Sequence, residues 1–317
     1  MTEAVHYIIG ASGQLGTELA LSLQMRGERV VLSDVRRPEH ADLQVLPFEM
    51  LDVRDRQALD VALEKAGATK VYLLAAALSA RGEGDPEWAW DLNMRGLLNV
   101  LEHAAASEVV DQIFWPSSIA VFGPETPAVA PQKGERKPTT VYGISKNAGE
   151  QWCAWYRAHR GVDVRSVRFP GLIGHRSVPG GGTTDYAVDI FIEANATGAY
   201  TCFLSEHQRL PMLYMDDAVD SIHELMAAPA ADLTVETSYN IHGMDFTPGE
   251  LAQAIAERVE GFTIVYKPDF REAIAASWPD ALADADARKD WGWAPKVGMD
   301  ELVKIMLEAK KMALSET

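Results

Sequence analysis

The sequence predicts an α/β protein with a doubly wound parallel sheet, followed by a smaller and less regular C-terminal part. Short apolar runs rich in β-branched residues alternate with longer segments of helical periodicity between residues 5 and 168. This pattern is typical of a parallel sheet with helices on both faces. A glycine-rich turn at residues 10–16 joins the first apolar run to the first helical segment. Together these two features define the expected fold class.

The predicted elements alternate strictly up to residue 168. Leu15, Leu19 and Leu23 give the first helix an apolar stripe, and Gly27 ends it. Pro86 begins a long helical segment, because proline is favoured in the first turn of a helix. The expected strands are 5–9, 29–34, 45–49, 70–74, 112–115 and 164–168, and the expected helices are 14–25, 54–65, 86–107 and 142–159.

The alternation becomes irregular after Pro170. The sequence contains no linker, repeat or low-complexity segment. We therefore expect residues 1–170 to form the sheet domain and residues 171–317 to form a cap that packs with it as one unit and returns some segments to the sheet. In the cap we expect helices at 186–197, 216–226 and 248–259 and short strands at 201–203, 239–241 and 263–266.

The composition excludes several classes of function. The 317 residues are 47% hydrophobic and 24% charged, as in an ordinary globular enzyme, and the net charge of −17 would repel nucleic acid. Cys153 and Cys202 are the only cysteines, which favours a reduced, cytoplasmic protein. The eight scattered histidines offer no zinc-ligand spacing, so no metal is expected. The run Val5–Ile9 is too short for a signal peptide or a membrane span, so no membrane partner is expected.

The turn Gly10-Ala11-Ser12-Gly13-Gln14-Leu15-Gly16 has the composition of a dinucleotide-binding loop. A strand precedes it and a helix follows, so its backbone N–H groups approach a pyrophosphate at the positive end of the helix. Gly13 allows this close approach, and Gly16 lets the helix pack against the strand. We therefore predict a Rossmann cofactor site, to which the turn contributes Gly10, Ser12, Gly13, Gln14, Leu15 and Gly16.

Asp34 ends the second predicted strand. Its carboxylate is suited to accept hydrogen bonds from both adenosine ribose hydroxyls and would repel a 2′-phosphate, which favours NAD over NADP. Val35 and Arg36 follow it and are expected at the same end of the cofactor. Arg36 and Arg37 could also hold a phosphate, which weakens the preference. The alternative role for Asp34 is a cap of its own strand end.

Two further strand ends are candidates for cofactor contacts. The pair Asp52-Val53 follows the third strand, where an aspartate can meet the adenine amino group. Alternatively, Asp52 is the N-cap of the helix that begins at Arg54. The run Leu74-Ala75-Ala76 ends the fourth strand with small side chains that leave room for a cofactor, although plain packing also explains them.

Tyr142 and Lys146 are four residues apart in a predicted helix and therefore lie on one face. A free phenol has a pKa of about 10, and a nearby ammonium is expected to lower the pKa of Tyr142 while also holding the nicotinamide ribose. Such a pair is common by chance. However, Ser117 and Ser118 end the fifth strand, at the carboxyl edge where open α/β sheets bind ligands. The sequence thus predicts an active site that contains Tyr142, Lys146 and one of these two serines.

These motifs resemble the extended short-chain dehydrogenase/reductase family. The Gly-x-x-Gly-x-x-Gly spacing of the turn and the strand-end Ser118 followed by Tyr142-x-x-x-Lys146 are similar to the family's pattern. The run Trp291-Gly292-Trp293-Ala294-Pro295 is similar to its C-terminal element. The sequence departs from the pattern at Phe122, where the family usually has tyrosine.

The resemblance implies a role for each site residue. Tyr142 would take the hydroxyl proton while hydride passes to the nicotinamide, Ser118 would hydrogen-bond the substrate oxygen, and Lys146 would tune Tyr142. Asn93 and Leu172 would contribute to the cofactor site. For Asn93, a structural role in satisfying a backbone carbonyl is favoured over direct catalysis.

Four longer runs resemble the short-chain L-threonine 3-dehydrogenases of that family: residues 73–79, 114–123, 179–187 and 203–212. This resemblance implies oxidation of the L-threonine 3-hydroxyl to 2-amino-3-ketobutyrate with NAD and without a metal. Neutral donors suit a small zwitterion, and the expected substrate-binding residues are Ser79, Ser118, Tyr142, Gly182, Thr183, Thr184 and Trp278. The alternatives are a mobile surface loop for the glycine-rich stretch and a packing role for Trp278.

Two other functions stay open at this point. A nucleotide-sugar epimerase or reductase of the same family would need cations for a diphosphate, for which Arg176 and Arg209 are the candidates in the cap. A non-catalytic NAD sensor would bind the cofactor and regulate a partner. It would have no need of Ser118, Tyr142 and Lys146 together, which counts against it.

The helices predicted at 86–107 and 142–159 carry more apolar and aromatic residues than one covered face requires. In the family the corresponding helices form a four-helix interface between two subunits. The resemblance therefore implies a homodimer.

Overall fold

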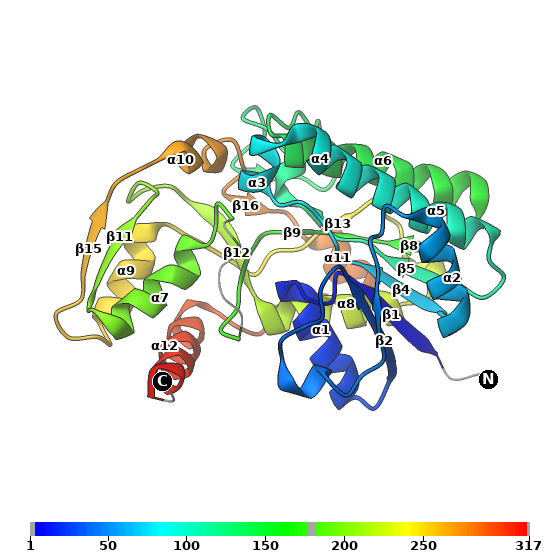
Figure 1. The fold of residues 1–317 in the computed structure, drawn as a ribbon. Helices are drawn as coiled ribbons and strands as arrows, with labels where there is room; N and C mark the ends of the chain where they lie inside the picture. The colour runs from blue at the N-terminus through cyan, green and yellow to red at the C-terminus, as the bar shows by residue number, and fades with distance from the viewer. Residues whose placement is uncertain (1–3, 177–179, 181, 316–317) are drawn as a thin grey trace.

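The computed structural model describes residues 4–176, 180 and 182–315 (Figure 1). Its centre is a parallel sheet of six strands in the order β3-β2-β1-β4-β5-β8. The strand order reverses at β1, as in a doubly wound nucleotide-binding fold. The strands are β1 (Val5–Ile9), β2 (Arg29–Asp34), β3 (Phe48–Met50), β4 (Lys70–Leu73), β5 (Gln112–Phe114) and β8 (Val164–Arg165).

Three short strands form a second parallel sheet in the order β13-β9-β6. They are β6 (Ser117–Ser118), β9 (Val167–Phe169) and β13 (Tyr239–Asn240). β6 follows β5 after Trp115-Pro116, and β9 follows β8 after Ser166. These strands therefore carry the path of β5 and β8 onward toward the carboxyl edge, where ligands bind in this class of fold.

Each face of the main sheet has its own apolar core, because successive side chains of a strand point to opposite faces. Tyr7 and Val31 belong to one core, and Ile8 and Leu32 belong to the other. The helices that contribute to the first core are α2 (Arg56–Ala66), α5 (Gly96–Ala106) and α6 (Val141–Arg160), and those of the second are α1 (Gln14–Met25), α8 (Met215–Ala227) and α11 (Ala285–Trp291). The predicted doubly wound fold is confirmed.

The predicted helix 86–107 is interrupted by a wider turn. It consists of α4 (Pro86–Trp90), a π-helical turn at Asp91–Arg95, and α5. A π-helical turn inserts one residue into the helical ladder and often marks a functional site. Here the turn contains the buried Asn93.

The cap is built around a third apolar core. Its strands are β10 (Gly171–Ile173), β12 (Leu210–Tyr214) and β14 (Met244–Phe246) in one sheet, and β11 (Ala199–Cys202) with β15 (Thr263–Tyr266) in another. Its helices are α7 (Tyr186–Ala196), α9 (Pro248–Ala256), α10 (Phe270–Ala275) and α12 (Met299–Ser315). In Figure 1 these elements form a lobe beside the main sheet.

The remaining described elements are short. They are α3 (Ser79–Gly84), the strand pair β7 (Val129–Ala130) and β16 (Ala281–Leu282), and 3₁₀ turns at Ala41–Leu43, Ile119–Val121 and Ala230–Asp232. The elements α8, β13 and α11 lie beyond residue 170 but pack on the main sheet. The division at residue 170 stays a prediction. Within the described ranges, no helix has the length and apolarity to cross a membrane.

Candidate active site

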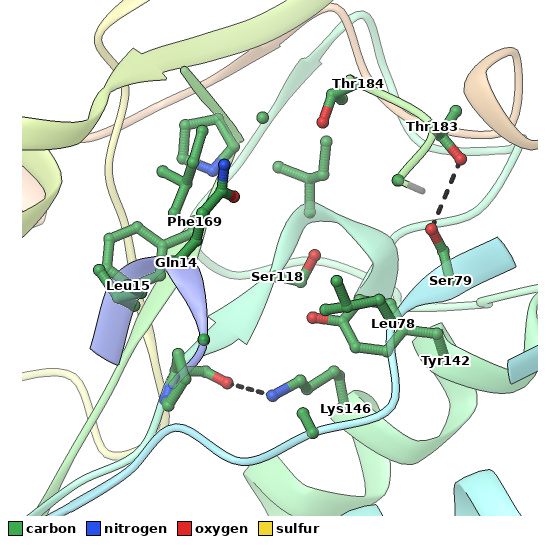
Figure 2. A pocket seen from close by; sticks show the side chains of 18 of the residues that line it. Gln14, Leu15, Leu78, Ser79, Ser118, Tyr142, Lys146, Phe169, Thr183 and Thr184 are labelled. Atoms are coloured by element: carbon green, nitrogen blue, oxygen red, sulfur yellow. Dashed lines mark hydrogen bonds between the residues drawn. The ribbon is translucent and has the colours of Figure 1, made fainter. Parts of the chain in front are cut away.

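A pocket lies at the carboxyl edge of the main sheet, between the glycine turn and the cap (Figure 2). It brings together residues from both halves of the chain, which sequence analysis had proposed separately. The predicted site residues that line it are Gly10, Gly13, Gln14, Leu15, Gly16, Leu74, Ala76, Ser79, Ser118, Tyr142, Lys146, Leu172, Gly182, Thr183, Thr184 and Trp278. The predicted site residues that do not line this pocket are Ser12, Asp34, Val35, Arg36, Asp52, Val53, Ala75 and Asn93.

The glycine turn is shaped so that only glycine fits at two of its positions. Gly10 has a φ of +91°, and a Cβ there would lie 2.4 Å from the backbone nitrogen of Ala75. A Cβ at Gly16 would lie 2.2 Å from the carbonyl oxygen of Gly10. Gly13 is the N-cap of α1, so the N–H groups of the first helical turn are directed at the pocket. This cradle fits the pyrophosphate of a dinucleotide.

Asp34 lies directly behind the turn. Its Oδ2 atom accepts a hydrogen bond of 3.0 Å from the N–H of Ser12, and its Oδ1 atom accepts one of 2.7 Å from the N–H of Val35. The Ser12 hydroxyl donates to the carbonyl oxygen of Arg36 at 2.6 Å. The carboxylate therefore has both the local capping contact and a position beside the turn that suits ribose recognition.

The structure does not support the alternative role expected for Asp52, that of a helix N-cap. The expectation that the helix begins at Arg54 with Asp52 as its N-cap is wrong, because α2 begins at Arg56 and the Asp55 carboxylate accepts a hydrogen bond of 3.0 Å from Ala58. The Arg54 guanidinium binds the Asp52 carboxylate through two donors, at 3.0 and 2.6 Å. These hydrogen bonds hold the pKa of Asp52 below its ordinary value.

Tyr142, Lys146 and Ser118 meet at the centre of the pocket. The side chains of Ser118 and Tyr142 face each other in Figure 2, one from the end of β6 and the other from the first turn of α6. The Lys146 ammonium donates to the carbonyl oxygen of Pro116 at 2.5 Å and lies 4.5 Å from the centre of the Trp115 ring. The three side chains predicted to be catalytic therefore share one site.

The ionisation of this site differs from the sequence-based expectation. Burial raises the pKa of Tyr142 to about 12, while the hydrogen bond with Ser118 acts in the opposite direction. Burial also lowers the pKa of Lys146 to about 7, against the influence of Cys153 and Glu150. The expected lowering of the Tyr142 pKa by Lys146 is therefore not found, because desolvation outweighs the effect of neighbouring groups. The positive charge of oxidised nicotinamide would favour the phenolate when NAD is bound.

Asn93 is engaged within the protein. Its Oδ1 atom accepts from the N–H of Ala77 at 2.7 Å, and its Nδ2 group donates to the carbonyl oxygen of Ala77 at 3.3 Å and to the Ser145 hydroxyl at 2.9 Å. It thus joins the end of β4 to the helix that carries Tyr142 and Lys146. These contacts favour the structural role over direct contact with the cofactor.

The cap supplies neutral polar groups to the pocket. The hydroxyls of Ser79 and Thr183 lie 3.5 Å apart (Figure 2), and both residues are buried. The indole N–H of Trp278 is buried without a hydrogen-bond partner among the described residues. Within the run 179–187, Pro179 and Gly181 lie outside the described residues.

The two cap arginines that were candidates to bind a diphosphate, Arg176 and Arg209, are paired with carboxylates. Arg176 donates to Glu18 at 2.6 Å and to Asp216 at 3.0 Å. Arg209 donates to Asp245 at 2.7 Å and to Glu250 at 2.5 Å. Neither arginine lines the pocket.

Sequence analysis missed part of the pocket lining, namely Leu78, Pro116, Ile119, Phe169, Pro170, Gly171 and Asp185. A signal existed for Phe169 and the residues after it, since they follow a strand predicted to end at the ligand-binding edge. Asp185 lies next to the glycine-rich stretch and its carboxylate accepts a hydrogen bond of 2.7 Å from the N–H of Gly182. Leu78 and Ile119 are apolar and carry no sequence signal of their own. In the described part of the chain there is no group of side chains that could hold a metal ion.

A proton-transfer pair that faces a dinucleotide-binding turn defines this protein as an NAD-dependent oxidoreductase of the short-chain dehydrogenase/reductase class. Residues 6–241 match the NAD dependent epimerase/dehydratase family, and the chain belongs to this family. Its cofactor is NAD. An uncharacterised epimerase/dehydratase of Staphylococcus haemolyticus is 44% identical over 95% of this chain and 96% of its own.

The chain is also similar to several solved structures along almost its whole length. A GalE-like L-threonine dehydrogenase from Cupriavidus necator, in its holo form, is 56% identical with a TM-score of 0.93 over 96% of this chain and 98% of its own. A monomeric L-threonine 3-dehydrogenase from metagenomic sequences is 42% identical with a TM-score of 0.93 over 97% and 99%. A UDP-glucose 4-epimerase from Thermotoga maritima is 21% identical with a TM-score of 0.85 over 98% and 99%, a likeness that shows the fold alone.

Proposed function

We propose that this protein oxidises the 3-hydroxyl of L-threonine to 2-amino-3-ketobutyrate with NAD as the acceptor. The observation that carries the proposal is the lining of the pocket, where uncharged polar residues from α3 and from the cap share one cavity with Ser118, Tyr142 and Lys146. The likeness to L-threonine dehydrogenases along almost the whole chain supports the same substrate.

The pocket chemistry suits a small zwitterion. The hydroxyls of Ser79, Thr183 and Thr184 and the indole N–H of Trp278 are neutral donors of the kind that orient a carboxylate in a largely apolar pocket. Asp185 adds a carboxylate to the lining, which favours the ammonium group. We expect these residues to hold the amino acid so that its 3-hydroxyl lies between Ser118 and Tyr142.

The proposed reaction needs one proton acceptor from the protein. NAD, when bound, supplies the hydride acceptor. Ser118 donates a hydrogen bond to the substrate oxygen, and the Tyr142 phenolate takes the hydroxyl proton as the carbon–oxygen double bond forms and the C–H pair leaves as hydride. Lys146 would hold the nicotinamide ribose, and the positive charge of the bound oxidised nicotinamide would favour the phenolate. A placed proton acceptor of this kind accelerates the chemical step by about a hundred- to ten-thousand-fold.

A nucleotide-sugar substrate has less support from the site. A diphosphate is usually bound by arginine or lysine, and both cap candidates are already paired with carboxylates outside the pocket. A dehydratase would also need acids next to Ser118, where this chain has Ile119 and Ala120. The chemistry therefore favours a small amino acid.

The test is NADH formation from L-threonine and NAD, with L-threonine plus NADP and UDP-galactose plus NAD as parallel controls. We expect rapid reduction only with L-threonine and NAD. Tyr142→Phe should keep NAD affinity and lose turnover by at least about a hundredfold. Tight NAD binding without threonine oxidation would reject this substrate, and near-normal activity of Tyr142→Phe would reject the mechanism.

A further inference from the structure

Three side chains on α6 contact three consecutive residues at the carboxyl end of the neighbouring strand. Tyr142, Lys146 and Glu150 are spaced by four residues and therefore share one helix face. Tyr142 faces Ser118, Lys146 donates to the carbonyl oxygen of Pro116, and Glu150 accepts a hydrogen bond of 2.6 Å from the Ser117 hydroxyl. Glu150 thus completes a row of contacts of which the first two belong to the active site.

Close packing makes this row rigid. A Cβ at Gly149 would lie 2.5 Å from the Trp115 ring, so the helix approaches the strand as closely as glycine allows. The backbone of Ser117 pairs with that of Arg168 on β9. The side chain of Arg168 binds Glu150 through two parallel hydrogen bonds, both 2.8 Å long. Ser117 is therefore held by Arg168 through its backbone and by Glu150 through its side chain.

Glu150 is fully buried and carries the charge that balances two arginines. Arg136, from the segment before α6, also donates to its carboxylate. Arg168 in turn donates to Asn240 at 2.9 Å and to the carbonyl oxygen of Gln132 at 3.1 Å. Burial alone would raise the pKa of Glu150, but the hydrogen bonds and charges of the two arginines and the Ser117 hydroxyl outweigh it and lower the pKa. The carboxylate is therefore ionised beneath Lys146.

We propose that Glu150 is a positioning residue of this active site. Through Ser117 it fixes the strand end that places Ser118 opposite Tyr142, and its charge shields Lys146 from Arg136 and Arg168. The kinetic part of this inference rests on the proposed function. Cys153 and Tyr142 on the same helix also lie near Lys146, and burial raises the pKa of both side chains, so neither is charged at neutral pH.

Two variants separate the two roles. Ser117→Ala removes the hydroxyl contact but keeps the paired charges, so kcat for L-threonine should fall roughly three- to tenfold while the dissociation constant for NAD stays unchanged. Glu150→Gln removes the charge as well. Because the negative charge favours the protonated lysine, the pKa of Lys146 should fall by about one unit. The titration is followed by NMR of lysine-labelled protein, in which Lys146→Arg identifies the signal.

Asp163→Asn is the matched control. It removes the carboxylate that pairs with the buried Arg165 on β8, the strand that precedes β9 and Arg168. Arg165 Nη2 donates a hydrogen bond of 2.8 Å to Asp163 Oδ2. We expect Asp163→Asn to lose about as much stability as Glu150→Gln, with no change in kcat or in the Lys146 titration.

The outcomes test the positioning role and the electrostatic role of Glu150 separately. An unchanged kcat in Ser117→Ala, or an equal loss in Asp163→Asn, would overturn the positioning role. An unchanged Lys146 titration in Glu150→Gln would overturn the electrostatic role. If Glu150→Gln fails to fold, Ser117→Ala still decides the positioning role. If the wild-type protein does not oxidise L-threonine, the proposed function fails while the titration still tests the charge of Glu150.

Discussion

The N–H of Ser12 donates a hydrogen bond of 3.0 Å to the Oδ2 atom of Asp34. This contact joins the glycine turn after β1 to the end of β2, so the turn that we expect to hold the pyrophosphate is tied to the carboxylate that we expect to recognise the ribose. Asp34 is therefore held beside the turn, where we predict that it favours NAD over NADP.

Asp34→Ala should weaken NAD binding by roughly ten- to a hundredfold, because hydrogen bonds to a charged group contribute about 1.5–3 kcal/mol. It should also reduce the preference for NAD over NADP, since the repulsion of a 2′-phosphate is lost. The dissociation constants of both cofactors measure this. Unchanged affinity for NAD would show that Asp34 acts only as a strand-end cap.

Gly16→Ala and Gly13→Ala should separate folding from cofactor binding. A Cβ at Gly16 would lie 2.2 Å from the Gly10 carbonyl oxygen, whereas the nearest atom to a Cβ at Gly13 is 3.4 Å away. Overpacking of about 1–3 kcal/mol should lower the Tm of Gly16→Ala by several degrees. Gly13→Ala should keep the Tm and lose NAD affinity, because its methyl group occupies the pocket where the pyrophosphate approaches. Thermal unfolding and cofactor titration measure the two effects. A larger loss of Tm in Gly13→Ala, with a larger loss of NAD affinity in Gly16→Ala, would contradict these roles of the two glycines.

The first half of the fold could be predicted because its signals are local. The predicted bounds of β1, α1 and β2 match the structure to the residue, since apolar periodicity and the intervening glycines define them. The third strand was expected at 45–49 but β3 is Phe48–Met50. Pro47 has no N–H to donate and contributes only its carbonyl oxygen, which accepts from Leu32 at 2.9 Å.

The parts that could not be predicted depend on tertiary contacts. β12 contains Pro211, which argues against a strand, yet it pairs with β10 on one side and β14 on the other in the buried core of the cap. The role of Glu150 depends on Arg136 and Arg168, which reach it from other segments. The pKa of Tyr142 depends on burial, which the spacing of Tyr142 and Lys146 does not reveal. The residue types of the site could be predicted, but their ionisation could not.

The turnover number should rise with pH. Burial raises the pKa of Tyr142, so the neutral phenol predominates at neutral pH and the active phenolate increases about tenfold for each pH unit below that pKa. We expect log kcat to rise with a slope of about one before it levels off at alkaline pH. A pH profile of kcat at saturating L-threonine and NAD measures this. A flat profile from neutral pH upward would contradict this prediction.

Trp278→Phe should raise the KM for L-threonine by about three- to tenfold, the effect of one lost hydrogen bond. Trp278 lines the pocket and its buried indole N–H has no partner among the described residues, so the substitution removes no hydrogen bond within the protein and should leave the Tm nearly unchanged. Trp291→Phe is the control, because its buried indole N–H is likewise unpartnered in the described structure but does not line the pocket. An equal KM for both variants would assign Trp278 to packing.

The helices that carry the active site also expose aromatic residues, which leads us to predict a homodimer. Trp152 and Trp155 on α6 are 40% and 42% exposed, and Trp90 at the end of α4 is 46% exposed. α4 and α6 pack beside each other at the top of the view in Figure 1. The rings of Trp152 and Trp155 contact each other with centroids 6.1 Å apart, and exposed aromatic residues of this kind are typical of a protein–protein interface.

Light scattering at micromolar concentration should give twice the 34.7 kDa mass of the chain. Trp152→Glu should shift the mass toward the monomer, because burying an unpaired carboxylate in an apolar interface is unfavourable. Val265→Glu replaces an exposed apolar residue of the cap and should leave the mass unchanged. The monomeric relative shows that a very similar fold exists without a partner, so the prediction depends on these tryptophans. A monomeric mass for the wild-type protein would contradict it.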